Sequence, residues 1–249
     1  TWRSPLAADN YVEYKDEDEL MTELDEQSFT SEIFDFTSKW NVETTVFNKL
    51  SLKSGIQNSL YKFSPGKQGA VLSGLSNFSS NTNASNSKTL WGNETSAYFD
   101  LQYKLLPKLI AQTGLRAVLF STQGSPYYGA EPRVNLAYAI NPRNSFELSY
   151  VRTFQSLQLL TSSTLGLPTD FWAPSMPTVK PSMGNQVAAS FSTRSIQNYR
   201  LSVEGYYKQQ FNLVEYKDDA PYRYEGKQWY DKVEQGNGHS YGAELMLEK

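Results

Sequence analysis

The sequence contains no cysteine and a single histidine, His239. Without cysteine it can form no disulfide, no thiolate nucleophile and no cysteine-ligated zinc site. One histidine also excludes a metal site built from several imidazoles. We therefore expect no metal centre and no bound cofactor.

Long hydrophobic runs are also missing. No stretch of about 18 apolar residues occurs, so the sequence predicts no membrane-spanning helix. The mean hydropathy of −0.55 is compatible with a soluble protein. It is equally compatible with a membrane barrel, because barrel strands alternate lipid-facing and lumen-facing side chains. The chain starts at Thr1 without the basic segment and the apolar segment of a signal peptide. We expect any such peptide to have been removed or to lie upstream.

An excess of positive charge is absent too. The net charge is −3 and the isoelectric point is near 5.4. Proteins that bind nucleic acid need a basic face, so we do not expect nucleic acid as a partner. Aromatic residues, in contrast, are plentiful at 14%, with 17 tyrosines and 13 phenylalanines. Tyrosine suits positions where one end of a side chain is apolar and the other is wet.

The dominant pattern is an alternation of apolar and polar residues with period two. In residues 34–46 the even positions include Phe34, Phe36, Trp40 and Val42, while the odd positions are polar or charged. This alternation predicts a β-strand with one apolar face. It recurs in about nine runs, each longer than the 5–6 residues typical of globular strands. We predict that one outer face contains Phe36, Leu52, Leu101, Leu115, Leu136, Leu148, Leu201 and Leu245.

The connections between these runs differ in length. Short turns are predicted at residues 48–49, 107–108, 141–144 and 194–198. They alternate with longer connections at residues 65–93, 121–130, 157–185 and 214–239. Short turns at one end and long loops at the other are typical of outer-membrane barrels, with periplasmic turns and extracellular loops. The predicted fold is all-β: an antiparallel meander of about nine long strands, part of a transmembrane β-barrel.

Residues 1–30 differ from the rest because they are acidic and show no long alternation. We expect an acidic extracellular loop or N-terminal segment here, followed by a partial transmembrane barrel over residues 31–249. The acidic run at residues 16–19 lacks the glycine and the ligand spacing of a calcium loop, so we interpret it as a solvated charge cluster. Residues 76–87 are rich in serine and asparagine and predict a flexible loop tip.

Several short motifs resemble one family of barrels. The segment Gly166-Leu167-Pro168-Thr169-Asp170-Phe171-Trp172-Ala173-Pro174-Ser175 is similar to a subgroup from gut-type and related bacteria. Further motifs are Gly114-Leu115-Arg116, Glu131-Pro132-Arg133, Ser149-Tyr150-Val151-Arg152, Glu204-Gly205-Tyr206-Tyr207-Lys208, Asn212-Leu213-Val214 and Tyr241-Gly242-Ala243-Glu244. Their order and loop spacing, over roughly residues 31–249, resemble the barrel of TonB-dependent receptors.

This resemblance implies a Gram-negative outer-membrane barrel of about 22 strands with an N-terminal plug inside it. It also implies uptake of a nutrient (a glycan, a peptide or a metal chelate) driven by proton-motive force that TonB relays. The expected partners are the lipid bilayer of the outer membrane and, in the full-length protein, the plug domain and TonB. A surface lipoprotein is a further candidate partner. The sequence departs from the family pattern because it contains no plug, so we interpret it as a mid-barrel segment.

Ligand contacts are expected from aromatic side chains in the long loops, because pockets commonly use aromatic faces. The alternative is that these side chains pack the loops together or form an interfacial belt. The candidates are Tyr127, Tyr128, Phe171, Trp172, Tyr222, Tyr224, Trp229 and Tyr230.

No residue is expected to perform covalent chemistry, so we do not expect an enzyme. His239 and Ser240 lie close to Glu234 in the sequence, but neighbours on a strand point to opposite faces and cannot form a catalytic pair. The sequons that begin at Asn77, Asn83 and Asn93 are interpreted as chance matches in an asparagine- and serine-rich bacterial loop.

Charged residues occur at the positions that alternate with the apolar ones. We expect them to face the lumen of the barrel, because an Arg or Lys that faces lipid costs roughly 2–4 kcal/mol at the membrane midplane. They include Lys39, Glu43, Lys53, Arg116, Glu131, Arg133 and Glu204. The rival interpretation is a soluble β-sandwich that binds carbohydrate through its loop aromatics. Such a fold would bury the apolar side chains of each strand against a second sheet and would protect the open sheet edges.

Overall fold

The computed structural model describes residues 2–16, 19–46, 49–74, 78–82, 89–161, 171–196, 198–217 and 228–249. No helix in these ranges is long and apolar enough to cross a bilayer. The strands are β1 (Trp2–Asp16), β2 (Glu19–Val46), β3 (Leu50–Gly74), β4 (Phe78–Thr82), β5 (Leu90–Leu106), β6 (Leu109–Thr122), β7 (Ser125–Asn141), β8 (Asn144–Gln155), β9 (Leu157–Leu160), β10 (Phe171–Pro174), β11 (Ser182–Thr193), β12 (Arg200–Tyr216) and β13 (Val233–Glu248), with a short 3₁₀ helix, η1 (Trp229–Asp231), before β13.

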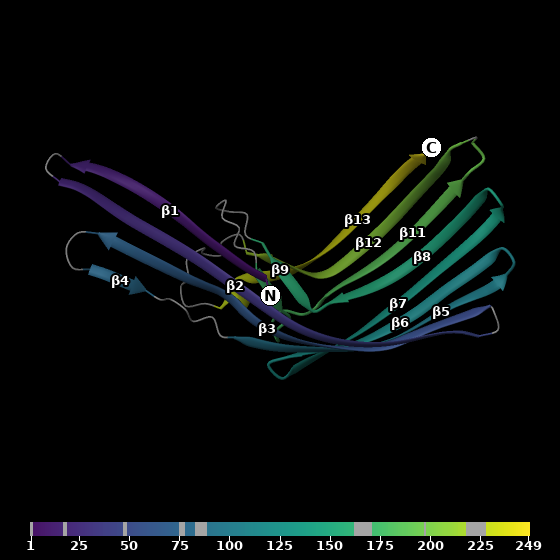
Figure 1. The fold of residues 1–249 in the computed structure, drawn as a ribbon, viewed down its shortest axis with the longest axis horizontal. Helices are drawn as coiled ribbons and strands as arrows, with labels where there is room; N and C mark the ends of the chain where they lie inside the picture. Colours follow the sequence, from purple (N-terminus) through teal and green to yellow (C-terminus); the bar gives the residue numbers. More distant parts are fainter. Residues whose placement is uncertain are drawn as a thin grey trace.

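The long strands form one curved antiparallel sheet (Figure 1). Their order in space is β1-β2-β3-β5-β6-β7-β8-β11-β12-β13, so each long strand pairs with its neighbours in the sequence, and β4 adds to β3. The predicted meander of nine long strands is therefore confirmed as β2, β3, β5–β8 and β11–β13. The rival β-sandwich is wrong, because the long strands lie in one continuous sheet rather than in two facing sheets.

The pairing of the strands confirms which residues were predicted to share one face of the sheet. Directly opposed residues of an antiparallel pair point to the same face, and Leu52 opposes Leu101, Leu136 opposes Leu148 and Leu201 opposes Leu247. Followed from strand to strand, the pairs place all eight predicted apolar residues on one face. We call this the outer face and the opposite one the inner face.

The outer face exposes large apolar side chains along its whole width. Phe36 is 61% exposed, Leu115 50% and Leu245 71%. Water-soluble proteins rarely leave apolar patches of more than a few hundred Å² uncovered. A face of this kind is stable against lipid hydrocarbon, which explains why a chain with low mean hydropathy still builds an apolar surface.

Two short turns lie where they were predicted, whereas the turns predicted at residues 48–49 and 194–198 include residues 48 and 197, which lie outside the described ranges. Residues 107–108 join β5 to β6, and residues 142–143 join β7 to β8. The longer connection expected at residues 121–130 is wrong, because Thr122 pairs directly with Ser125. Gln123 and Gly124 both have positive φ, 47° and 78°. Two positive φ values match the primed hairpin turns that fit the strand twist.

The other three long connections contain more strand than was expected. β3 continues to Gly74, β12 continues to Tyr216, and β9 and β10 lie within the connection at residues 157–185. In the acidic segment, β1 pairs with the first part of β2, from Trp2 opposite Ile33 to Asp16 opposite Glu19. This hairpin extends past the neighbouring strands in Figure 1. Its extracellular position stays a prediction.

Candidate functional site on the inner face

The inner face is polar where the outer face is apolar. Glu43 opposes Lys53 and Arg116 opposes Glu131, so these charges share the face opposite to Leu115. Lys39, Arg133 and Glu204 have the same parity. Register thus places all seven predicted charged residues on one face of the sheet, opposite to the apolar face.

Arg116 on β6 joins two carboxylates on its neighbouring strands. Its Nη2 lies 2.9 Å from Glu94 Oε1 on β5, and its Nη1 lies 2.9 Å from Glu131 Oε2 on β7. The three side chains are only 13–23% exposed. The planar guanidinium presents its donors in a fixed fork, so one arginine can bind both glutamates at the same time.

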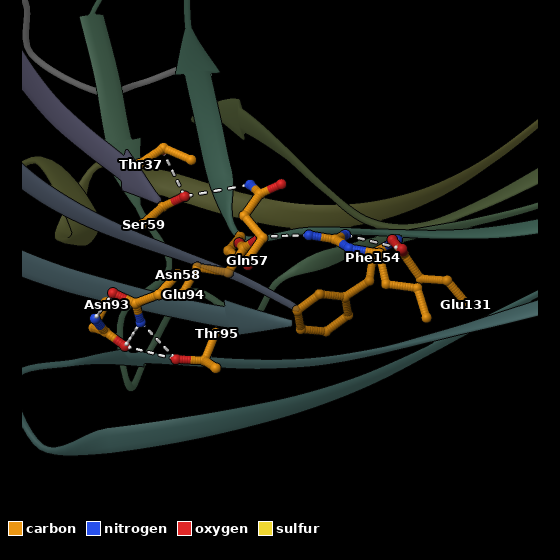
Figure 2. Close-up of polar contacts among 11 residues, drawn as sticks. Thr37, Gln57, Asn58, Ser59, Asn93, Glu94, Thr95, Glu131 and Phe154 are labelled. Carbon is orange, nitrogen blue, oxygen red and sulfur yellow. Dashed lines mark hydrogen bonds and ion pairs between the residues drawn. The ribbon is translucent and has the colours of Figure 1, made fainter. Parts of the chain in front are cut away.

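The second oxygen of each glutamate holds the end of β8. Glu94 Oε2 accepts a hydrogen bond from the Ser156 hydroxyl at 2.9 Å. Glu131 Oε1 accepts one from the backbone N–H of Phe154 at 2.7 Å. Figure 2 shows Glu94, Glu131 and Phe154 gathered around this network. The ion pairs therefore determine where the chain leaves the sheet.

The Phe154 ring lies where a side chain at position 129 would be. A Cβ on Gly129 would sit 2.5 Å from the ring, so position 129 admits only glycine beside it. A similar close approach occurs at Gly114, above which Asp100 reaches Arg133 at 3.3 Å. Both glycines leave room for a neighbouring side chain.

After β8 the chain folds onto the inner face. We call residues 156–161 and 171–181 the inward segment. It contains the β9–β10 hairpin, in which Phe171 opposes Leu160 and Pro174 opposes Leu157. β10 contacts β2 and β3, and β9 contacts β12, so the hairpin spans between two distant parts of the sheet.

An apolar cluster anchors the inward segment. Phe63 on β3 is fully buried, and residues of the segment, of β5 and of β13 surround it. Burying a side chain of this size contributes about 1.5–3 kcal/mol. The members of the cluster are Phe63, Leu90, Leu160, Ala173, Met176, Val179 and Val233.

Hydrogen bonds fasten the same segment. The Ser175 hydroxyl donates to the Ser156 carbonyl at 2.9 Å, and Met176 and Val179 exchange two backbone bonds of 2.9 Å. The Lys180 backbone N–H donates to Gln235 Oε1 at 2.9 Å, and Gln235 Nε2 donates to the Lys180 carbonyl at 2.8 Å. The described part of the inward segment is thus a fixed element of the inner face rather than a free loop.

Three of the predicted aromatic residues converge on this cluster. The Tyr127 hydroxyl donates to the Met176 carbonyl at 2.6 Å. Trp229 and Tyr230 pack against the cluster and meet edge to face, with ring centroids 5.7 Å apart. Sequence reasoning missed Phe63 and Glu94, because neither lies in a long loop and the partners of both are distant in sequence.

The other predicted aromatics are not brought together. Tyr128 is 77% exposed and has the parity of the outer face, since it opposes Leu119. Trp172 on β10 is 36% exposed. Phe171 begins β10. Tyr222 and Tyr224 lie outside the described residues.

A polar hollow lies on the inner face toward the short-turn end. Its volume is about 420 Å³, and its lining includes Lys53, Asp100, Gln112, Arg133 and Ser149. Across it, Gln112 donates to Gln102 at 3.2 Å and Asn135 donates to Gln112 at 3.5 Å. Within the described ranges, no three His, Asp or Glu side chains are grouped to hold a metal ion. The hollow thus offers hydrogen-bond donors and acceptors.

The family described as "TonB dependent receptor-like, beta-barrel" matches residues 2–248. A comparison with curated protein sequences gives no match. Among solved structures, the chain is similar to the FrpB iron transporter from Neisseria meningitidis, with 13% identity and a TM-score of 0.60 over 98% of this chain and 41% of that one.

Two further structures share the fold. The siderophore receptor PirA from Acinetobacter baumannii has 10% identity and a TM-score of 0.55, over 92% of this chain and 39% of that one. The RagAB peptide importer has 13% identity and a TM-score of 0.55, over 91% and 28%. The chain therefore spans less than half the length of these proteins, which are transporters and receptors rather than enzymes. With a match over nearly its whole length, the chain belongs to the family of TonB-dependent receptor β-barrels, which lie in the outer membrane of Gram-negative bacteria.

Proposed function

We propose that the full-length protein imports a nutrient across the outer membrane, with energy from the proton-motive force that TonB relays through a plug domain. The substrate class is a glycan, a peptide or a metal chelate. Family membership supports this proposal, and so do the names of similar structures, which include an iron transporter, a siderophore receptor and a peptide importer.

One observation carries the proposal beyond family membership. The inward segment covers part of the inner face at the long-loop end and is fixed there by the buried cluster around Phe63. Loops held on a rigid scaffold commonly form binding sites. A fixed segment at the extracellular mouth would narrow the entrance and offer a preformed surface, so that binding loses little conformational entropy.

We propose that aromatic side chains at this mouth contact the ligand. Trp172 is exposed on β10, and Trp229 and Tyr230 form an edge-to-face pair against the cluster. Tyr127, Phe171, Tyr222 and Tyr224 are further candidates. Tyr128 is the weakest candidate, because its side chain lies on the face turned to lipid.

Binding rather than covalent chemistry is the proposed role of this chain. His239 opposes Gln209 on the outer face, whereas Ser240 opposes Lys208 on the inner face. The polar hollow with Gln112 and Arg133 is the proposed contact surface for the plug in the full-length protein. A surface lipoprotein at the long-loop end stays a candidate partner.

Uptake in whole cells tests the function. Cells that produce the full-length receptor are compared with cells that lack it, for uptake of ferric siderophores, oligopeptides and oligosaccharides. We expect receptor-dependent uptake of one class, and its loss when a protonophore collapses the proton-motive force. Failure of every class, with folded receptor at the surface, would contradict the proposed function.

Aromatic substitutions test the binding surface. Replacing Trp172 and Trp229 with Ala should reduce ligand bound per receptor, because two of the proposed contact rings are lost. Tyr128→Ala removes an aromatic ring of similar size from the outer face and serves as the matched control. Receptor folding is measured separately by heat-modifiable gel mobility. Unchanged binding per folded receptor would assign both tryptophans to loop packing.

A further inference from the structure

The β9–β10 hairpin has one buried face and one exposed face. Leu160 and Ala173 are buried in the cluster around Phe63. Leu159 and Trp172 oppose each other on the other face of the hairpin, where they are 45% and 36% exposed. Because neighbours on a strand point to opposite faces, this apolar pair points away from the cluster and is open to a ligand.

β12 and β13 also present a pair of residues on the side away from the cluster. Val214 and Tyr216 pack against the cluster, so the alternation along β12 turns Glu215 to the opposite side. Glu215 opposes Glu234 on β13, and directly opposed residues point to the same face. Both glutamates are exposed, and in the part of the chain that the structure describes neither of them forms an ion pair.

The apolar hairpin face and the glutamate pair meet in one hollow, which we call the rim hollow. It lies between β9 and β12, which contact each other, and its volume is about 480 Å³. One side of it is apolar, and the only charged side chains of its lining are the two glutamates. It lies at the long-loop end, which is extracellular in barrels of this kind. Its lining includes Leu159, Thr161, Leu213, Glu215, Glu234 and Asn237.

A bulge in β12 holds the walls of the rim hollow in place. The register between β12 and β13 shifts between Gln210 and Leu213, and Asn212 in this bulge has a positive φ of 55°. The backbone N–H of Asn212 donates to Asn237 Oδ1 at 3.2 Å, and its Nδ2 donates to the Pro181 carbonyl at 3.0 Å. One residue therefore joins β12, β13 and the inward segment, so the hollow is preformed and a ligand loses little binding energy in ordering it.

The two sides of the rim hollow together select a cation that has an apolar stem. Like charges directly opposite each other destabilise a strand pair, and a cation between Glu215 and Glu234 removes that repulsion. A neutral sugar offers no cation, and anionic oxygens that hold iron in a chelate are repelled by the carboxylates. A lysine or arginine side chain places its aliphatic stem against Leu159 and Leu213 and its charge between the glutamates.

We propose that the rim hollow and Trp172 together bind an oligopeptide in which an apolar residue stands two positions from a lysine or arginine. Side chains two positions apart in an extended peptide share a face, so the cationic side chain enters the hollow while the apolar one packs on the Trp172 ring. This inference rests on the proposed import function and names a basic peptide as its substrate class. It adds Leu159, Leu213, Glu215 and Glu234 to the residues that contact the ligand.

Titration calorimetry with the purified full-length receptor in detergent tests the proposal. The probes are the acetylated and amidated peptides Leu-Ala-Lys-Ala-Leu, Leu-Ala-Gln-Ala-Leu and Ala-Ala-Lys-Ala-Ala, together with spermidine, a cation without apolar side chains. We expect the first peptide to bind most tightly, and added salt to weaken its binding because exposed charges are screened. Spermidine should bind about tenfold more weakly, because it lacks the apolar contact with Trp172.

A double variant, Glu215→Gln with Glu234→Gln, removes the charge of the rim hollow and keeps its shape. It should bind Leu-Ala-Lys-Ala-Leu about fivefold more weakly, as for the loss of two exposed ion pairs, and bind Leu-Ala-Gln-Ala-Leu as the wild type does. Glu204 and Glu244 oppose each other on the same two strands at the short-turn end. Glu204→Gln with Glu244→Gln is therefore the matched control and should leave peptide binding unchanged. Heat-modifiable mobility checks that both variants fold.

The apolar part of the site is tested by Trp172→Ala. This variant should weaken the binding of both leucine-containing peptides alike, because each packs a leucine on the ring. It should leave the binding of Ala-Ala-Lys-Ala-Ala unchanged, since that peptide uses the glutamates alone. The two sets of variants thus separate the charge of the rim hollow from the apolar contact beside it.

Three results would overturn the proposal. The first is equal binding of the lysine and glutamine peptides by the wild type. The second is unchanged binding of Leu-Ala-Lys-Ala-Leu by the folded Glu215 and Glu234 double variant. The third is binding of spermidine as tight as that of this peptide, which would indicate a site for polyamines instead.

Calorimetry requires no transport, so the rim hollow and the import function are tested separately. A receptor that imports only glycans or chelates and binds none of the peptides would retain the proposed function and overturn this inference. A receptor that binds the peptides as expected and imports no nutrient would support the rim hollow and contradict the proposed function.

Discussion

The Ser156 hydroxyl donates a hydrogen bond of 2.9 Å to Glu94, although the two residues are separated by 62 positions in the sequence. The same glutamate pairs with Arg116, which also pairs with Glu131. One residue on β6 therefore fixes the exit of β8, and with it the start of the inward segment. The barrel wall and the mouth of the site are connected through this network.

Removal of Arg116 should destabilise the barrel strongly. Arg116→Gln leaves Glu94 and Glu131 facing each other without a cation in a half-buried site, and losing one partner of a buried ion pair costs about 3–5 kcal/mol. Arg133→Gln is the control, because its ion pair with Asp100 is more exposed and longer, at 3.3 Å, and exposed pairs contribute about 0–1 kcal/mol. Urea unfolding of the full-length protein in detergent measures both. Equal losses would contradict the bracing role.

The lipid assignment of the outer face gives a second prediction. Leu115→Arg puts a charge on the outer face, where Leu115 is 50% exposed, and this costs roughly 2–4 kcal/mol near the membrane midplane. Gln112→Arg puts the same charge on the polar inner face beside Gln102 and Asn135. Heat-modifiable gel mobility should show a large assembly defect for Leu115→Arg alone. Equal assembly of both variants would contradict the assignment.

The strands could be predicted from the sequence because one physical rule determines where apolar residues stand along each strand. A face turned to lipid must be apolar at every second residue, so Phe36, Leu101 and Leu201 reveal which residues share that face, and this excludes every register that is shifted by one residue. The inward segment follows no such rule. Its buried contacts join Leu160 and Met176 to Phe63 and Val233, and period-two analysis cannot detect contacts between elements so far apart in sequence.

The candidate site was predictable only in part for the same reason. The loop aromatics are conspicuous in the sequence, yet Tyr127 and Tyr128 are neighbours on a strand and point to opposite faces. The turn at Gln123 and Gly124 was missed because Gln-Gly is a weaker turn signal than Asn-Gly or Asp-Gly. Glu94 was missed because its role depends on Ser156 and Arg116, which no local pattern connects to it.

The same turn provides a test of backbone strain alone. Gly124 has φ of 78°, and a Cβ built there meets nothing within 4 Å, so Gly124→Val acts only through its backbone. A left-handed conformation costs a side-chain-bearing residue about 1–2 kcal/mol. We expect a loss of that size in urea unfolding, whereas Gln123→Gly, at φ 47°, should be neutral or stabilising. A neutral Gly124→Val would indicate that this turn adopts another conformation.

The fixed position of the inward segment can be tested with an introduced thiol, because residues 1–249 contain no cysteine that would compete for the reagent. Met176 is 2% exposed and contacts the cluster around Phe63. In intact cells, Met176→Cys should therefore resist a membrane-impermeant maleimide. Adding Phe63→Ala removes the centre of the cluster, at a cost of about 3–5 kcal/mol, and should make the thiol reactive.

The control places the thiol further along the same segment, at Lys180. This residue is exposed, so Lys180→Cys should react in both backgrounds and report that the reagent reaches the mouth of the barrel. Heat-modifiable mobility confirms that the barrel still forms after Phe63→Ala. If the Met176→Cys and Lys180→Cys variants were labelled at the same rate in the otherwise native protein, the segment would move freely. Protection of the Met176→Cys thiol in both backgrounds would mean that the hydrogen bonds of Ser175 and Lys180, rather than the apolar cluster, hold the segment on the inner face.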